Sequence, residues 1–386
     1  MLKGASFADR QVRIRGVRLG TEASMKHLLL LGGGHAHVQV LHALATEPLP
    51  AVRVTLVSPY ARQLYSGMVP GVVAGHYSVD DCAIALPQLA ARAQVEFIES
   101  PANHIDAQAH VVTLGDSRRL SYDVVSIDTG PEMNRDAIPG AREHGLFVRP
   151  IEHFARMWDA LLALAEQRGL SVVVVGAGAA GVELACAMQY RLGDRARVSL
   201  VTGGPPVLAN YTPRVQERAR AALRRLSITV LEDTCKEVTA LHLILGGGTK
   251  VQCDAPVMAI GISAPQWLAG SGLALDAQGF ITTSATLQST SHADVFAAGD
   301  VASNLALQRP KSGVFAVRAG PALALNLRRY LGGGMLEEHL PKLRSLNLLA
   351  CGRRSAIASW GKWSAEGAWV WYWKNWVDRK FVAKYR

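Results

Sequence analysis

Short apolar runs that end in glycine recur along this chain, and the apolar spacing changes after each of them. The first run, His27–Leu31, has the length and composition of a buried parallel strand. Three glycines follow at once, and apolar residues then fall at Val38, Leu41 and Ala45, a spacing that suits a helix packed on a sheet. The same order returns in residues 171–188, SVVVVGAGAAGVELACAM. The pattern predicts an α/β fold in which a strand–turn–helix unit occurs twice.

Both glycine turns have the form that holds the diphosphate of a dinucleotide, because glycine allows close approach and the helix start offers free N–H groups. The first turn reads Gly32-x-Gly34-x-x-His37, with histidine in place of the third glycine. The second turn, Gly176-x-Gly178-x-x-Gly181, is intact. The cofactor contacts expected in the two turns are Gly32, Gly34, His35 and Ala36, and Gly176, Gly178, Ala179, Ala180 and Gly181.

The strand after each turn ends without the acid that usually holds the adenosine ribose of NAD. Val52–Val57 is followed by Ser58, and Arg197–Val201 is followed by Thr202. A hydroxyl can still bond a ribose, so both residues are expected cofactor contacts. The missing acid favours FAD over NAD at the first turn, and the choice between NADH and NADPH at the second stays open.

Further contacts are expected outside the two turns. Gln63–Tyr77 is rich in glycine and aromatics, and it is either a surface loop or, as its place in the chain favours, a segment against a flavin ring. The strand Val295–Ala298 delivers Gly299 and Asp300, whose carboxylate can bond a ribityl hydroxyl unless the pair is a simple turn. The remaining expected contacts are Pro70, Ala102, Thr129, Gly130 and Gly261.

Composition narrows the class of protein. The 386 residues are 49% hydrophobic and 19% charged, which is typical of a globular chain with full cores. The net charge of +10 comes without a nucleic-acid-binding signature, so we expect no nucleic-acid partner.

Five cysteines without CxxC spacing predict reduced thiols and a cytoplasmic location. We expect no metal site, since His35, His37 and His42 lie where a metal would compete with the diphosphate.

The motifs divide the chain into segments. Residues 1–24 read as an extension, and Met25, directly before the first strand, is a candidate for the true start. Residues 25–150 and 269–330 are predicted to form an FAD domain in two segments, with an NAD(P)H domain at 151–268 between them. Residues 331–386 form an interface segment that holds six of the eight tryptophans.

Two dinucleotide turns about 140 residues apart, with a Gly-Asp pair near the end, resemble the flavoproteins with two dinucleotide-binding domains. These are the type II NADH dehydrogenases and the pyridine nucleotide-disulfide oxidoreductase superfamily. The likeness is greatest to a branch associated with selenophosphate synthetase, on GGGHAH, YSGMVPGVVAGHY, LVTGGPP and AIASWGKWSAEGAWVWYWKNWVDRKF. The resemblance implies FAD at the first turn, at Thr129-Gly130 and at Gly299-Asp300, and NAD(P)H at the second turn.

The resemblance also implies catalytic residues. Glu183 matches a glutamate that lies where nicotinamide meets flavin in type II NADH dehydrogenases, and Lys374 is a candidate partner from the tail. The cysteine pairs of disulfide and sulfide:quinone reductases are missing. Val314 and Arg318 replace the glutamines of the quinone site, which puts quinone as the acceptor in doubt.

We therefore expect an FAD-dependent NAD(P)H oxidoreductase that reduces a quinone or another small acceptor. A sulfide- or selenide-oxidising enzyme is the alternative, for which Cys82 is the eligible thiol. A second alternative is an NAD(P)H-sensing flavoprotein that acts through a protein partner. The tail helix has a stripe of Val370, Trp373, Val377 and Phe381, which we expect to pack on the flavin domain or across a homodimer. Peripheral contact with the cytoplasmic face of a membrane is the other interpretation of this stripe.

Overall fold

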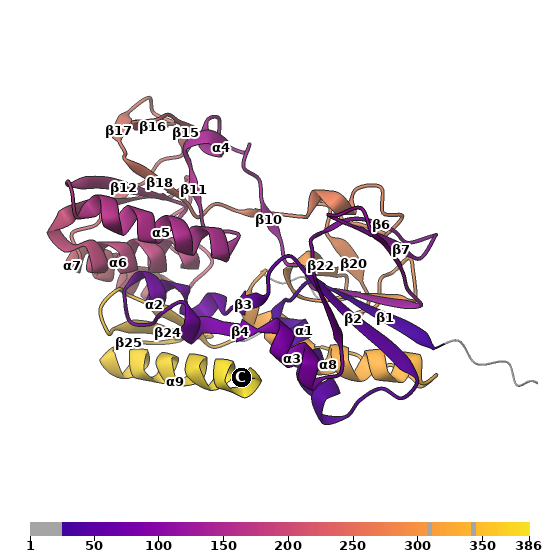
Figure 1. Cartoon of the computed structure of the whole chain (residues 1–386). Coiled ribbons are helices and arrows are strands. Elements are labelled where there is room, and N and C mark those ends of the chain that lie inside the picture. The colour runs from indigo at the N-terminus through magenta and orange to yellow at the C-terminus, as the bar shows by residue number, and fades with distance from the viewer. Residues whose placement is uncertain (1–24, 307–310, 341–344) are drawn as a thin grey trace, which may run out of the picture.

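The computed structural model describes residues 25–306, 311–340 and 345–386. The predicted extension and the choice of Met25 as the start therefore concern residues outside the described part. Two α/β units lie side by side, and the C-terminal helix runs beneath one of them and ends beside the other (Figure 1). This confirms the predicted fold class.

The first unit is built on a parallel five-stranded sheet in the order β21-β9-β1-β2-β5. Leu28–Leu31 of β1 are fully buried, because α1 and α8 cover one face of the sheet and a small antiparallel sheet lies over the other. Its strands are β1 (Lys26–Leu31), β2 (Val52–Ser58), β5 (Glu96–Glu99), β9 (Val124–Ile127) and β21 (Val295–Ala297), and its helices are α1 (His35–Thr46), α3 (Leu86–Arg92) and α8 (Gly313–Leu331). The smaller strands are β6 (Ala102–Asp106), β7 (Val111–Leu114), β8 (Arg119–Ser121), β20 (Ile281–Thr283) and β22 (Ala302–Asn304).

The second unit repeats this plan with the order β11-β18-β12-β13-β14. Val172–Val175 of β12 form a buried apolar run, as β1 does in the first unit. Its strands are β11 (Leu146–Phe147), β12 (Leu170–Val175), β13 (Ala196–Val201), β14 (Thr229–Leu231) and β18 (Ala255–Met258), and its helices are α4 (Ala141–His144), α5 (Ile151–Ala165), α6 (Ala179–Leu192) and α7 (Pro213–Arg225). A meander of β15 (Cys235–Val238), β16 (His242–Leu245) and β17 (Lys250–Gln252) lies above the sheet in Figure 1.

The unit boundaries differ from the predicted 151–268. The chain crosses between units on β10 (Glu132–Met133) and returns on β19 (Ile262–Ser263), and these strands pair with each other. The second sheet already includes β11, and Leu268 packs in the core of the first unit. Short strands pass between units without a change in composition, which is why the sequence pattern missed both crossings.

Gln63–Tyr77, interpreted as either a surface loop or a segment against a flavin ring, is largely regular structure. It holds the end of β3 (Arg62–Leu64), a short 3-10 turn at Ser66–Met68 and α2 (Val69–Val73), and β3 pairs with β4 (Ala83–Ala85). Helix α2 packs against α6 of the second unit. The surface-loop interpretation is therefore wrong, and contact with a flavin ring stays a prediction. Gly71 serves close packing, since a Cβ there would overlap the Tyr77 ring.

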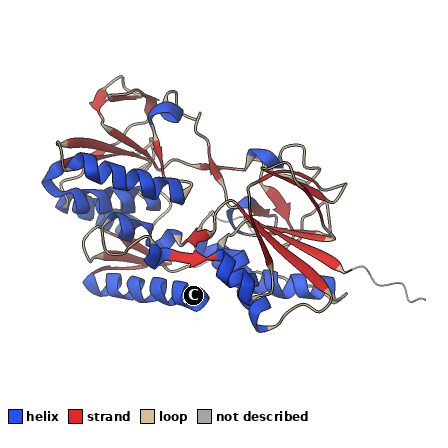
Figure 2. Cartoon of the chain, in the orientation of Figure 1, coloured by secondary structure: helices blue, strands red, loops and turns tan. Residues whose placement is uncertain are grey.

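The tail joins the two units. Its antiparallel sheet, β23 (Asn347–Ala350), β24 (Ala356–Trp360) and β25 (Trp363–Gly367), lies on α6 and α7. Helix α9 (Ala368–Tyr385) runs beneath this sheet and contacts β4 of the first unit, as Figure 2 shows. Arg225 and Arg218 of α7 both pair with Glu366 at the tail sheet. The second unit and the tail are therefore held by charge as well as by apolar packing.

The buried face of α9 is not the predicted stripe. Val370 is buried, but Trp373, Val377 and Phe381 are only half-buried. The buried positions are Val370, Trp371, Lys374, Asp378, Val382 and Tyr385. A lysine and an aspartate lie inward because they pair with each other, which a purely apolar pattern could not predict. Among the described helices, none is long and apolar enough to cross a membrane.

Candidate active site

The first glycine turn lies between β1 and α1, at the carboxyl end of the parallel sheet. Gly32 has a φ of +94°, and Gly34 is the N-cap of α1. A Cβ on Gly32 would overlap the backbone at Asp128 and Thr129, and one on Gly34 would overlap the Asp128 carboxyl. Glycine is required at both positions because β9 approaches the turn closely. His35 and Ala36 begin the helix.

His37 occupies the position of the missing third glycine. Its ring is fully buried, with Nδ1 2.6 Å from the Gly32 carbonyl oxygen and Nε2 2.8 Å from the Ser126 hydroxyl. A carbonyl only accepts, so Nδ1 carries the proton and Nε2 accepts from the hydroxyl. Burial lowers the pKa of His37 to about 4, and the ring is neutral at neutral pH. Hydrogen bonds thus replace the close packing that a third glycine gives.

Asp128 is a site residue that the sequence analysis did not select. Its Oδ2 accepts hydrogen bonds from the backbone N–H groups of Ala36 at 2.7 Å and His37 at 2.9 Å. Burial and the nearby Asp300 raise its pKa to about 8, against the lowering effect of the two N–H groups. The sequence feature that could have identified Asp128 is an acid at the end of a strand, directly before Thr129-Gly130.

The rest of the first site has open glycine surface beside an acid. Gly130 has a φ of +75°, and a Cβ there would meet no atom within 4 Å. Asp300 follows β21, and its Oδ2 lies 3.7 Å from Arg149 Nη2. Burial raises the pKa of Asp300, while Arg149 and Lys311 lower it. An open cradle at a helix start with a carboxylate at the strand end fits FAD, whose diphosphate and ribityl hydroxyls need those groups.

The second glycine turn, at α6, is built differently. Gly176 has a φ of +109°, and a Cβ on Gly181 would overlap its carbonyl oxygen, so here the third glycine sets the helix–strand distance. Gly178, the N-cap of α6, and Gly261, after β18, face open space. Ala179 and Ala180 form the first turn of α6. This cradle is free to receive a second dinucleotide.

The other expected contacts are more scattered. Ser58 ends β2, but its Oγ is 3.0 Å from the Tyr60 carbonyl oxygen, to which it donates. Thr202 follows β13 and accepts a hydrogen bond from the Gly204 N–H at 3.3 Å. Ala102 begins β6. Pro70 lies in the first turn of α2, which packs on α6 of the second unit and is not part of the first glycine turn.

Glu183 and Lys374 belong to one buried cluster. Lys374 donates from Nζ to the Gly67 carbonyl oxygen at 2.6 Å and to Asp378 Oδ2 at 2.7 Å. Glu183 Oε1 accepts from the Ala350 N–H at 2.7 Å. Burial raises the pKa of Glu183 to about 7, and Lys374 acts against that rise. The fold therefore brings together groups from α6, from α9 and from the segment before α2.

Aromatic rings connect this cluster to the first glycine turn. Tyr65 stacks on Phe381 with ring centroids 4.5 Å apart, and the His35 ring lies 5.5 Å from Tyr65. Burial raises the pKa of Tyr65, and the nearby Asp378 and Glu183 raise it further. Burial and Arg149 lower the pKa of His35 to about 4. A group of neutral aromatic rings thus lies between His35 of the first turn and Phe381 of α9.

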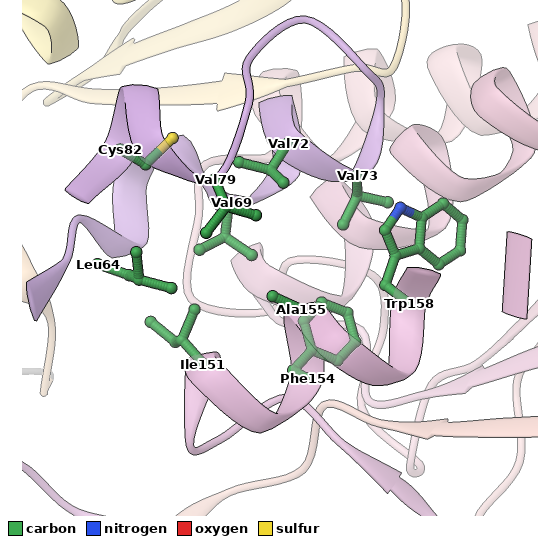
Figure 3. Close-up of a pocket in the computed structure, with 10 residues that line it drawn as sticks. All are labelled: Leu64, Val69, Val72, Val73, Val79, Cys82, Ile151, Phe154, Ala155 and Trp158. Atoms are coloured by element: carbon green, nitrogen blue, oxygen red, sulfur yellow. The ribbon is translucent and has the colours of Figure 1, made fainter. Parts of the chain in front are cut away.

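Cys82 lines a pocket between α5 and residues 64–82 (Figure 3). Every side chain in the lining is apolar except the thiol. The thiol donates a hydrogen bond to the Ser78 carbonyl oxygen, with Sγ 3.5 Å from that oxygen. Burial raises the pKa of Cys82 to about 12. All five cysteines are free, and the described residues contain no group of three or more His, Cys, Asp or Glu that could hold a metal.

The model of the pyridine nucleotide-disulphide oxidoreductase family matches residues 26–320, which include both glycine turns and Asp300. The chain belongs to this family. The predicted enzyme class is confirmed: it is an oxidoreductase, and its cofactors are FAD and NAD(P)H.

Curated relatives are distant but cover most of the chain. It is 26% identical to the oxidoreductase ptaL of Pestalotiopsis fici, over 89% of this chain and 94% of the relative. It is 26% identical to the demethylphylloquinone reductase NdbB of Synechocystis, over 71% of each chain. Identity to the NADH dehydrogenase-like protein YutJ of Bacillus subtilis is 25%, over 84% and 89%. These relatives confirm the likeness to NADH dehydrogenase-like flavoproteins.

Solved structures confirm the fold. NDH2 from Plasmodium falciparum in complex with NADH superposes with a TM-score of 0.81 at 14% identity, over 93% of this chain and 97% of that one. The sulfide:quinone oxidoreductase of Aquifex aeolicus gives 0.79 at 19% identity, over 94% and 91%. Enzymes with different electron donors share this fold, so the substrate must be argued from the site.

Proposed function

We propose that this protein passes electrons from NAD(P)H through FAD to a quinone or another small acceptor. The buried cluster of Glu183, Lys374 and Asp378 carries the proposal, because it joins the NAD(P)H unit, the tail and the segment beside the first glycine turn. A quinone acceptor is supported by the relatives named as quinone reductases. The four quoted stretches of sequence also support a place in the branch associated with selenophosphate synthetase.

Bound FAD supplies the chemistry of accepting a hydride from nicotinamide and delivering electrons to the second substrate. Glu183 holds a proton near neutral pH, which an acceptor that gains electrons requires. The Lys374 ammonium, fixed by Asp378 and Gly67, stabilises negative charge that develops on such an acceptor. The tail positions both groups by bridging the two units.

An anaerobic titration of the purified protein with NADH and then NADPH tests this function. We expect the visible flavin band to bleach within about seconds, and the more effective nucleotide then gives the nicotinamide preference. A panel of quinones, sulfide and selenide follows under the same conditions. Flavin that stays oxidised with both nucleotides would contradict the proposal.

The two alternatives have separate tests. A sulfide- or selenide-oxidising enzyme needs a thiolate, but burial holds Cys82 as a thiol whose pKa is about 12. We therefore expect Cys82→Ser to retain turnover with every acceptor to within about twofold, and a specific loss with sulfide would favour the alternative. Bleaching by NAD(P)H with negligible turnover on every acceptor would favour a sensing flavoprotein.

We further propose that the outer face of α9 contacts a lipid surface. Trp369, Tyr372 and Trp376 lie at i, i+3 and i+7, and each is more than half exposed. Lys380 and Lys384 are also exposed, and Lys380 lies over the Trp376 ring at 4.9 Å. Exposed aromatics followed by basic residues suit an anionic bilayer interface. This face lies beside the predicted stripe, which is half-buried.

Vesicle flotation tests this contact. We expect binding to vesicles that contain phosphatidylglycerol, and weaker binding to pure phosphatidylcholine, because the lysines contribute about 1 kcal/mol each at an anionic surface. The triple variant W369Q/Y372Q/W376Q should lose binding, while the control Y190F, at an exposed ring on α6, should not. Equal flotation of the triple variant would contradict the proposal, and so would a dimer that the triple variant abolishes.

A further inference from the structure

The Asp128 carboxyl occupies the start of α1, where an anionic ligand would be held. Its Oδ2 accepts two hydrogen bonds there, from Ala36 N–H at 2.7 Å and His37 N–H at 2.9 Å. These are orphan donors of the first helical turn, the groups that bind a diphosphate in this kind of turn. The protein has therefore placed an acid of its own at the anion-binding end of the helix.

Two turns of the fold enclose this carboxyl. A Cβ on Gly34 or on Gly299 would overlap the carboxyl group, so the turns after β1 and β21 both close around it. Asp128 itself follows β9, the strand between them, and is 2% exposed. Water cannot solvate a charge at this position, and the ionised form is disfavoured.

The charged groups around Asp128 do not neutralise it. Asp300, from the turn after β21, is a like charge that raises the pKa of Asp128. Arg149 and Lys311 act on Asp300 and lower its pKa. His35 and His37 on α1 both have a pKa of about 4 and are uncharged at neutral pH. Among the residues that the structure describes, the site therefore offers Asp128 hydrogen bonds but no cationic partner.

We propose that Asp128 couples FAD binding to a proton, so that the first glycine turn holds FAD with this carboxyl neutral and releases FAD as the carboxylate forms. The diphosphate of FAD is itself an anion, and a second charge at the same helix start repels it. The inference rests on the proposed flavin chemistry only in placing FAD at this turn.

The sign of the pH dependence follows from linkage. Without FAD the pKa of Asp128 is about 8, and a bound diphosphate raises it further. The affinity for FAD is constant below about pH 8 and falls above it, by up to about tenfold per pH unit. Release in this range frees one proton for each FAD. Asp128→Asn keeps an oxygen that accepts from Ala36 and His37 but carries no charge, so its affinity does not change with pH.

The experiment dilutes the holoprotein at a series of pH values and follows released FAD by its fluorescence. We expect release from the wild type to increase about fivefold between about pH 8 and pH 9, and D128N to show no such increase. The control D254N removes an acid of the second unit, which pairs with Arg168, and should keep the wild-type pH dependence. A pH indicator in weak buffer counts the protons released.

The outcomes distinguish failure of the proton coupling at Asp128 from failure of the proposed function. Wild-type release that is equal at about pH 7 and pH 9, or D128N release that follows the wild type, would overturn the coupling. The wild-type proton count remains decisive if D128N fails to fold, and a count of zero also overturns it. Flavin that binds with no pH dependence leaves the proposed function intact. A protein that purifies without any flavin contradicts both.

Discussion

Glu183 shows how burial can give an ordinary glutamate a proton at neutral pH. It sits in the second turn of α6, and the sequence indicates a catalytic role for it through resemblance. Burial raises its pKa to about 7, more than Lys374 and the Ala350 N–H lower it. The pKa values of Asp128 and His37 are shifted in the same way, by burial acting against a few fixed hydrogen bonds.

Replacement of Glu183 by glutamine tests its role. The variant keeps a group that can accept from Ala350 but has no proton to transfer, so we expect turnover to fall by about 10²-fold or more. The wild-type pH–rate profile should have an inflection near the pKa of about 7, and E183Q should lose it. The control E217Q changes an exposed acid of α7 and should keep the profile. An unchanged profile in E183Q would assign the inflection elsewhere.

Two helix–turn elements that read alike in sequence are assembled by different contacts. At α6 the third glycine, Gly181, allows the helix to lie on the Gly176 carbonyl. At α1 the same position is His37, which reaches the Gly32 carbonyl by a hydrogen bond. Helix α9 likewise packs through polar contacts that its apolar pattern does not show, because its buried face includes the paired Lys374 and Asp378.

The second glycine turn offers a matched pair of variants. A Cβ on Gly181 would overlap the Gly176 carbonyl oxygen, whereas one on Gly178 meets no atom within 4 Å. We expect G181A to lose about 1–3 kcal/mol of unfolding free energy, by the usual cost of overpacking. G178A should fold normally but bind NAD(P)H about tenfold more weakly or worse, because the added methyl group lies where the diphosphate approaches.

Denaturant unfolding and nucleotide titration of both variants separate these effects. Flavin content should stay at the wild-type level in G178A, since Gly178 belongs to the second unit. Normal NAD(P)H binding by a folded G178A would show that this turn does not receive the nucleotide.

At the scale of the whole molecule, the tail holds the two nucleotide-binding units together. Arg225 and Arg218 of the second unit pair with Glu366 of the tail. Lys374, further along the tail, donates to the Gly67 carbonyl oxygen in the first unit. The same contacts that fix the arrangement of the units bury several acids, so the stability of the whole protein depends on pH.

The pKa shifts predict that dependence for the flavin-free protein. Glu183 and Asp128 have raised pKa values of about 7 and 8, and their contribution to stability is lost as the pH rises from about 4, the pKa of unfolded carboxyls, to these values. His35 and His37 have lowered values of about 4, and their contribution is lost as the pH falls from 6.5 toward 4. The opposing slopes cancel below about pH 6.5.

We expect the free energy of unfolding to be level up to about pH 6.5 and to fall by about 2–3 kcal/mol by about pH 8. Urea titrations at several pH values measure it. The double variant E183Q/D128N should lose most of this decline, and a decline of wild-type size in that variant would contradict the assignment.

The two strand–turn–helix units, the glycines of both turns and the acid at Asp300 could all be predicted from the sequence, because they depend on patterns among residues close in the chain. The sequence also indicated Glu183 and Lys374, through resemblance. Only the tertiary structure decided which strands cross between the units, which face of α9 is buried, and that Asp128 lies against α1. These features depend on pairings such as Asp128 with Ala36 and Lys374 with Gly67, between residues far apart in sequence, and no local pattern records them. The pKa values follow from the same cause, since burial is a property of the assembled chain.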